Sequence, residues 1–202
     1  MKVMKTALSI AGTDPTGGAG LQASTERCTR GAGPQADPKT FAAHGVYGMG
    51  AITAIVAQNT TGVRAIENAS PAIVRAQLDA VFEDIFPDAV KIGMLPNAAV
   101  INAVAECLTK WRAQNVVIDT VMISSSGRRL LDEGAERDLV KRLFPLAHVI
   151  TPNIGEAETL CGFPIASRAD MTRAAKTLAA MTDAAVLLKG GHLPGDACDL
   201  LL

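Results

Sequence analysis

Short runs of apolar residues recur along this chain, and glycine, proline or polar residues bound each run. A continuous apolar run of about four to eight residues is typical of a strand that is buried on both faces. Six runs of this kind predict strands over residues 7–11, 51–57, 89–92, 116–118, 148–150 and 184–188. Such strands belong to a parallel sheet, because crossover helices cover both of its faces.

Between these runs, the apolar residues follow the period of a helix. Ser70 and Pro71 predict one helix start, since serine caps a helix and proline is tolerated in its first turn. Asn97 predicts a second start, and Ser167 with Asp170 predicts a third. We expect inward-facing stripes at Ile73, Val74, Leu78, Val81, Phe82 and Ile85, at Val100, Ile101, Val104, Leu108 and Trp111, and at Met171, Ala174, Leu178 and Met181.

The alternation of strands and helices predicts an α/β fold, a doubly wound and mainly parallel sheet with helices on both faces. We expect residues 1–202 to form a single domain, because a chain of this length with 49% hydrophobic content can build one core. Ligands of such sheets bind beyond the carboxyl ends of the strands. Polar or glycine-rich segments stand at those ends here, at residues 12–14, 58–60, 93–94, 119–120, 151–153 and 189–192.

Charge and hydropathy narrow the function classes. The formal net charge is −1 and no lysine- or arginine-rich run occurs, which argues against a nucleic acid as the main partner. No stretch approaches the roughly 18 uninterrupted apolar residues of a membrane span, and the N-terminus lacks the small-residue cleavage site of a secretory signal. We therefore expect a cytoplasmic protein.

The cysteines and histidines are scattered. Cys28, Cys107, Cys161 and Cys198 form no C-x-x-C pair and have no histidine at metal-ligand spacing, as expected of free thiols in a reducing compartment. A zinc site is not expected. The three histidines, His44, His148 and His192, are interpreted as structural or surface residues.

A glycine-rich segment, residues 12–20, directly follows the first predicted strand. Glycines allow backbone amides to approach a ligand closely, so the segment is interpreted as a ligand-binding strand-to-helix loop. It lacks the strict G-x-G-x-x-G spacing of dinucleotide-binding folds, and Gln58-Asn59 stands where those folds carry an acidic ribose ligand. A nucleotide-dependent dehydrogenase is therefore a weak alternative.

Six ordered motifs carry a more specific resemblance, at residues 10–20, 57–60, 91–95, 119–122, 151–156 and 188–192. Together they resemble the hydroxymethylpyrimidine kinase/phosphomethylpyrimidine kinase family of the ribokinase-like superfamily. The resemblance implies ATP- and Mg-dependent phosphorylation of 4-amino-5-hydroxymethyl-2-methylpyrimidine, and then of its monophosphate, in thiamine biosynthesis. Phosphoryl transfer depends mainly on positioning and electrostatics, so each binding group can be sought in the sequence.

The resemblance implies two groups of site residues. Gly12, Asp37, Gln58, Met94 and Val121 match substrate-binding positions, where Gln58 can donate and accept hydrogen bonds and Met94 and Val121 can supply apolar contact. Plain core packing is the alternative role of these last two.

In the second group, Asn153, Glu156 and Lys189 match nucleotide-binding positions, and Asp119 and Glu156 are candidate ligands of Mg. Asn153 and Glu156 also have the spacing of a helix capping box, which can hold at the same time.

The chain departs from the family pattern in a segment near residues 21–36. Residues 31–37 repeat residues 18–24 with five identities, which indicates a near-duplication that separates the glycine loop from Asp37. Pro34 and Pro38 stand where the family has a helix, and proline in a helix interior costs about 3 kcal/mol or more. We expect residues 24–34 to loop out and the position of Asp37 to be disturbed.

The second departure concerns the C-terminal end. The family carries a Gly-Thr-Gly-Cys helix start that forms an anion hole and supplies a catalytic cysteine, and no such run occurs here. We therefore expect the C-terminal part of the fold to be missing, and we assign no catalytic residue, Cys198 included.

Several alternatives stay open. A pyridoxine or pyridoxal kinase is one, because the same pocket could admit a substituted pyridine. A non-catalytic pyrimidine-binding module is another. A homodimer is implied only by the family.

Overall fold

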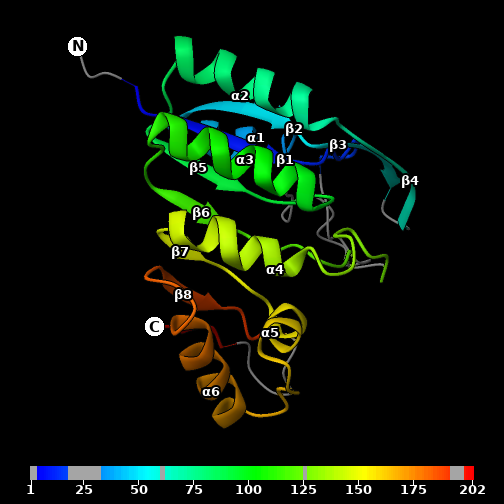
Figure 1. Ribbon diagram of the computed structural model, residues 1–202, viewed down its shortest axis with the longest axis vertical. Helices are drawn as coiled ribbons and strands as arrows, with labels where there is room; N and C mark the ends of the chain where they lie inside the picture. The colour runs from blue at the N-terminus through cyan, green and yellow to red at the C-terminus, as the bar shows by residue number, and fades with distance from the viewer. Residues whose placement is uncertain (1–3, 18–32, 60–61, 125–126, 192–197) are drawn as a thin grey trace.

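The computed structural model describes residues 4–17, 33–59, 62–124, 127–191 and 198–202 (Figure 1). Cys28, His192, residues 18–20 of the glycine-rich segment and most of the predicted insertion lie outside these ranges. The strands are β1 (Thr6–Ala11), β2 (Tyr47–Ile52), β3 (Ala54–Asn59), β4 (Gly62–Asn68), β5 (Ala89–Ile92), β6 (Val116–Ile118), β7 (Val149–Ile150), β8 (Ala185–Leu188) and β9 (Leu200–Leu201). The helices are α1 (Asp37–Ala43), α2 (Pro71–Asp84), α3 (Ala98–Trp111), α4 (Glu136–Asp138), η1 (Leu139–Leu143), η2 (Phe144–Leu146), α5 (Ile154–Cys161) and α6 (Arg168–Ala179).

The strands of the main sheet lie in the order β2-β1-β5-β6-β7-β8-β9, and only β8 and β9 pair antiparallel. A parallel crossover is nearly always right-handed. The step from β1 to β2 runs in one direction along the sheet, and the later steps to β5, β6, β7 and β8 run in the other, so their helices cover opposite faces. In Figure 1, α2, α3 and α6 lie in front of the sheet and α1 lies behind it. The predicted doubly wound α/β fold is confirmed.

One predicted strand, residues 51–57, was wrong. β2 ends at Ile52, the chain bends at Thr53, and β3 then pairs antiparallel with β4 in a separate two-stranded sheet. The bend is fixed because the buried Thr53 donates its N–H to Ala11 O at 3.0 Å and its hydroxyl to Met94 O at 2.7 Å. The two-stranded sheet thereby leaves the main sheet close to the end of β1.

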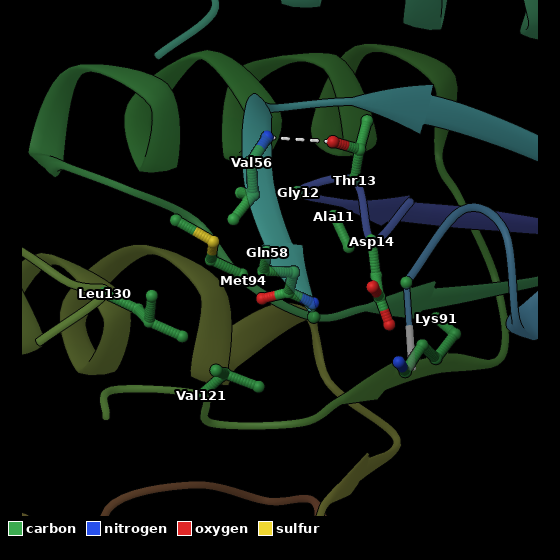
Figure 2. A pocket seen from close by; sticks show the side chains of 12 residues that line it. Ala11, Gly12, Thr13, Asp14, Val56, Gln58, Lys91, Met94, Val121 and Leu130 are labelled. Carbon is green, nitrogen blue, oxygen red and sulfur yellow. Dashed lines mark hydrogen bonds between the residues drawn. The ribbon is translucent and has the colours of Figure 1, made fainter. Parts of the chain in front are cut away.

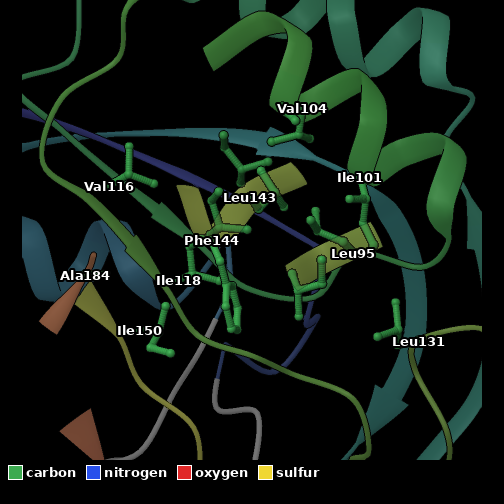
Figure 3. Packing of buried hydrophobic residues seen from close by; sticks show 14 of the residues in the cluster. Leu95, Ile101, Val104, Val116, Ile118, Leu131, Leu143, Phe144, Ile150 and Ala184 are labelled. Carbon is green, nitrogen blue, oxygen red and sulfur yellow. The ribbon is translucent and has the colours of Figure 1, made fainter. Parts of the chain in front are cut away.

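The core lies between the sheet and its helices. Leu143 and Phe144 are completely buried and lie close to Ile118 and Ile150 (Figure 3). The predicted helix starts are confirmed, because Ser70, Asn97 and Ser167 each accept a backbone N–H of the first turn that they cap. Among the described residues, no helix has the combined length and apolarity needed to cross a membrane.

Two members of the predicted stripe on α2 do not face the core. Val74, Leu78 and Phe82 form the buried stripe at a spacing of four residues. Ile73 is 51% exposed because it lies one residue, or about 100°, away from that line, and Ile85 is 37% exposed because the helix has ended before it.

The proline expected to disrupt a helix interior is instead in a first turn. α1 begins at Asp37, and Pro38 follows at its start, where a missing N–H removes no helical hydrogen bond. The expected cost of Pro38 therefore does not arise.

Candidate functional site

A cavity opens where the sheet reverses its strand order. β1 has β2 on one side and β5 on the other, so their carboxyl ends form a topological switch point, where ligands of such sheets bind. The cavity measures about 450 Å³, its open mouth included. It is lined by Ala11, Gly12, Thr13, Asp14, Gly33, Val56, Gln58, Lys91, Gly93, Met94, Val121 and Leu130 (Figure 2). Four of the five predicted substrate-binding residues are among them.

Strand β3 forms one wall of this cavity. Thr13 donates its N–H to Ala54 O at 2.8 Å, and its hydroxyl oxygen accepts the N–H of Val56 at 2.9 Å (Figure 2). These bonds join the segment after β1 to the two-stranded sheet. The bend at Thr53 is thus what brings Val56 and Gln58 to the cavity.

The apolar wall is tightly built. Met94 packs with Ala54 and Val56 in a small cluster that also includes Val121 and Leu130. A Cβ atom at Gly12 would lie 2.8 Å from Met94 Sδ, so a side chain at residue 12 would displace the methionine side chain from its present position. Met94 and Val121 therefore combine the two roles left open by the sequence, since they pack in a core cluster and line the cavity.

Asp14 is a buried polar residue of the cavity wall. Its carboxylate Oδ1 accepts the N–H and the hydroxyl of Thr16, at 3.0 and 2.8 Å, while its own N–H donates to Gln35 Oε1 at 2.9 Å. These bonds tie the segment after β1 to the chain just before α1. The sequence analysis did not single out Asp14, although it lies within the glycine-rich segment.

Asp37 lies beside the cavity but does not line it. Its Oδ2 atom accepts the hydroxyl of Ser9 at 2.6 Å and the ammonium of Lys91 at 3.0 Å, and its Oδ1 lies 3.3 Å from the same ammonium. Lys91 does line the cavity. The sequence analysis quoted Lys91 within a motif but gave it no role; its place in an apolar strand, where a charge needs a partner, was the available signal.

A charged cluster gathers at the ends of the next three strands. Lys189, after β8, donates to Asp119 Oδ1, after β6, at 2.8 Å, and the hydroxyl of Thr151, after β7, donates to the same oxygen at 3.1 Å. The Lys189 side chain is 38% exposed, so it is within reach of solvent and of a ligand. The structure thus brings together two of the predicted nucleotide and metal residues.

Asn153 and Glu156 belong to the same cluster and cap α5. Asn153 Oδ1 accepts the N–H of Glu156 at 3.0 Å, and Glu156 Oε2 accepts the N–H of Asn153 at 2.9 Å, which confirms the capping box. Burial raises the pKa of the Glu156 carboxyl, and the Asp119 carboxylate raises it further. The N–H of Asn153, the charge of Lys189 and the hydroxyl of Thr120 act in the opposite direction.

These carboxylates fit a magnesium ion that is held mainly by water and phosphate. Within the described residues, no three His, Cys, Asp or Glu side chains gather in a way that could enclose a metal. Mg²⁺ commonly binds through one or two carboxylates together with substrate phosphates. Asp119 and Glu156, which interact electrostatically beside Lys189, supply such a pair.

The cavity and the charged cluster are joined by one tight turn. Val121 lines the cavity, and its N–H donates to the carbonyl of Asp119 at 2.8 Å. A ligand in the cavity therefore lies within a few residues of the charges that would hold a nucleotide. None of the described cysteines, Cys107, Cys161 and Cys198, lines the cavity.

Comparison with known proteins identifies relatives over nearly the whole chain. Residues 28–202 match the family model described as phosphomethylpyrimidine kinase. The hydroxymethylpyrimidine/phosphomethylpyrimidine kinase of Escherichia coli is 48% identical over 93% of this chain. A crystal structure of phosphomethylpyrimidine kinase from Clostridium difficile matches 98% of this chain and 80% of its own, with 46% identity and a TM-score of 0.84.

A pyridoxal kinase is also structurally similar. The Bacillus subtilis enzyme, solved as an ADP complex, matches 99% of this chain and 71% of its own, with 36% identity and a TM-score of 0.82. The chain spans about two thirds of the length of the Escherichia coli relative, 66%. A family match over residues 28–202, together with this identity, shows that the chain belongs to the phosphomethylpyrimidine kinase family.

Proposed function

We propose that this chain binds 4-amino-5-hydroxymethyl-2-methylpyrimidine and its monophosphate in the cavity between β1, β3 and β5. The reaction is transfer of the ATP γ-phosphoryl group to the ligand, as part of thiamine biosynthesis. One observation carries the proposal: Gly12, Gln58, Met94 and Val121, assigned to the pyrimidine from the sequence, line a single cavity.

The cavity suits a small flat heterocycle. Met94 and Val121 offer apolar contact to the faces of a ring, and Gly12 leaves room for the ring to approach the backbone. The amide of Gln58 can donate to one atom of the ring edge and accept from another. This combination matches the alternating donors and acceptors of an aminopyrimidine.

The charged cluster is the proposed nucleotide site. Lys189 would meet the ATP phosphates as a point charge, and the capped start of α5 at Asn153 would lie beside them. Asp119 and Glu156 would hold Mg²⁺, which neutralises charge on the transferred phosphoryl group when it is bound. Phosphoryl transfer then depends on how accurately the cavity and the cluster align acceptor and donor.

A pyridoxal kinase is the second candidate, because solved pyridoxal kinases match this chain over nearly its whole length. The two functions differ in the heterocycle that the cavity prefers. A homodimer and a cytoplasmic location also remain predictions.

Calorimetric titration of the 202-residue chain with the pyrimidine, and separately with pyridoxal, tests the proposal. We expect the pyrimidine to bind more tightly than pyridoxal, and an ADP-release assay with Mg-ATP follows in the same sample. Binding with ADP release supports the kinase, and binding without it supports a pyrimidine-binding module. Preference for pyridoxal, or binding of neither compound by folded protein, contradicts the proposal.

A further inference from the structure

Lys91 is a basic residue in the wall of the cavity and has no role in the account above. It is the only lysine or arginine among the described residues that line the cavity. Its side chain comes from β5, and Asp37 approaches it from α1. The two residues are 54 positions apart in the sequence, so the pair forms only when the fold brings β5 and α1 together.

The pair is largely removed from water. The side chains of Lys91 and Asp37 are 21% and 10% exposed, and Ser9, which also bonds the carboxylate, is completely buried. An ammonium group in such a place is stable only with a counter-ion. Asp37 supplies that charge from the side away from the cavity.

The hydrogen bonds divide the roles of the two residues. Asp37 Oδ2 already accepts from Ser9 and Lys91, and Oδ1 lies close to the same ammonium. The hydrogen bonds that the structure gives Lys91 Nζ both go to Asp37, and an ammonium has three protons. Lys91 therefore keeps donor capacity at the cavity wall, where its ammonium lies beside Asp14 and Gln58 lies further along the wall (Figure 2).

We propose that Lys91 is a specificity-determining residue, which donates a hydrogen bond to an electron-rich ring atom of a heteroaromatic alcohol in the cavity. Asp37 is a positioning residue, which holds the ammonium at the cavity wall. This inference rests on the proposed function and revises one residue of it, because the carboxylate assigned to the ligand acts through its lysine. The ligand class is a neutral ring with a nitrogen acceptor on its edge.

Two ligands separate recognition from general stability. The first is 4-amino-5-hydroxymethyl-2-methylpyrimidine, and the second is (2-amino-4-methylphenyl)methanol, which has the same substituents on a benzene ring. Wild-type chain is expected to prefer the pyrimidine by roughly tenfold or more, since a hydrogen bond from a charged donor is lost with the analogue. A lysine that only stabilised the fold would leave this preference unchanged when it is replaced.

The variants are Asp37→Asn and the double variant Asp37→Asn/Lys91→Met, which removes both charges so that neither remains buried alone. Lys39→Met, at an exposed lysine of α1, is the control for loss of a positive charge. Calorimetry measures both ligands after circular dichroism has verified the fold. We expect Asp37→Asn to weaken the preference for the pyrimidine, because the Lys91 ammonium loses the carboxylate that holds it. The double variant should lose the part of the preference that Lys91 supplies and keep the part that Gln58 supplies, and the control should keep all of it.

Two results overturn the inference while leaving the proposed function intact: a double variant that keeps the full wild-type preference, or an Asp37→Asn variant that keeps it. If the double variant fails to fold, Asp37→Leu/Lys91→Met, which also removes both charges, is measured in its place, and an unchanged preference contradicts the inference. Failure of folded wild-type chain to bind the pyrimidine overturns the proposed function, and this inference with it.

Discussion

At the scale of single residues, the site depends on charges that are held in pairs. Lys189 is bonded to Asp119, and Lys91 is bonded to Asp37, at 2.8 and 3.0 Å. Each lysine lies at or near the carboxyl end of a strand, where it can meet a ligand, and each carboxylate prevents an unpaired buried charge. In the proposed function, the Lys189 pair belongs to the nucleotide half of the site and the Lys91 pair to the acceptor half.

Replacing Lys189 should weaken nucleotide binding without affecting binding in the cavity. Lys189→Ala removes a point charge from the proposed phosphate site but no atom from the cavity, so we expect ATP affinity to fall roughly 10- to 100-fold and pyrimidine affinity to change little. Calorimetric titration of the same preparation with each ligand measures both. An equal loss for the two ligands, or no loss for either, argues against the assignment.

Glu156 has a structural and a proposed functional role, and two substitutions distinguish them. Glu156→Gln can keep the capping box, whereas Glu156→Ala removes the side chain that caps Asn153, at a cost of about 0.5–2 kcal/mol in stability. Both variants lose a proposed Mg²⁺ ligand. We expect urea denaturation to show a clear loss only for alanine, and Mg-ATP titration to show weaker binding for both; normal Mg-ATP affinity of the glutamine variant contradicts a metal role.

At the scale of elements, hydrogen bonds between neighbouring helices and strands decide where each one lies. Asp79 of α2 accepts from Lys110 and from the indole N–H of Trp111 on α3, at 2.8 and 2.6 Å. These bonds lower the pKa of Asp79 below its ordinary value of 3.8. The hydrogen bond from Lys110 has the largest effect, and the bond from Trp111 the second largest. This carboxylate thus links two helices of one layer.

The sign of its pH effect follows from the lowered pKa. The link stabilises the fold fully above pH 3.8 and is lost as the pH falls through the lower folded-state value. Because the pair is partly exposed, we expect Asp79→Asn to cost less than about 1 kcal/mol at neutral pH and to flatten the acid dependence below pH 3.8. Urea denaturation, followed by the fluorescence of Trp111, measures both; Asp84→Asn is the control for charge on α2. An unchanged acid dependence in the Asp79 variant contradicts the link.

The sequence predicts most elements of this fold but not the pairing between distant ones. The caps at Ser70, Asn97 and Ser167 and the apolar runs are local signals, and the structure confirms the caps and five of the six runs. The bend at Thr53 left no signal, because the apolar run continues through it and the cause is a bond to Met94, 41 residues away.

The same limit applies to the site. Gly12, Gln58, Met94 and Val121 come from four separate motifs of the family resemblance, and the structure brings them to one cavity. The partners of Asp37 and Asp119 lie 54 and 70 residues away along the chain. Such pairings depend on strand order, which hydrophobic periodicity does not specify.

At the scale of the whole molecule, the switch in strand order places the cavity, and β9 pairs with β8 at one side of the sheet. Gly190 is buried, and its N–H donates to Asp199 Oδ1 at 3.0 Å. A Cβ atom at residue 190 would overlap the carbonyl oxygen of Cys198 and lie 3.0 Å from Met171. The approach of β9 to β8 therefore requires a glycine at this position.

Gly190→Ala should push β9 away from β8. We expect a loss of about 1–3 kcal/mol in the free energy of unfolding, the usual cost of forcing an atom into a packed site. Gly191→Ala is a matched control, because a Cβ atom there meets nothing within 4 Å, and it should change stability by less than about 0.5 kcal/mol. Urea denaturation measures the free energy of unfolding of both variants. Equal values for the two variants would contradict the close packing of β9 at Gly190.

The most direct test of the two-part site is a crystal structure of this chain with 4-amino-5-hydroxymethyl-2-methylpyrimidine, Mg²⁺ and a non-hydrolysable ATP analogue. We predict the pyrimidine in the cavity between Gln58, Met94 and Val121, and the nucleotide phosphates beside Lys189. A pyrimidine bound outside this cavity, or phosphates bound away from Lys189, would contradict the account.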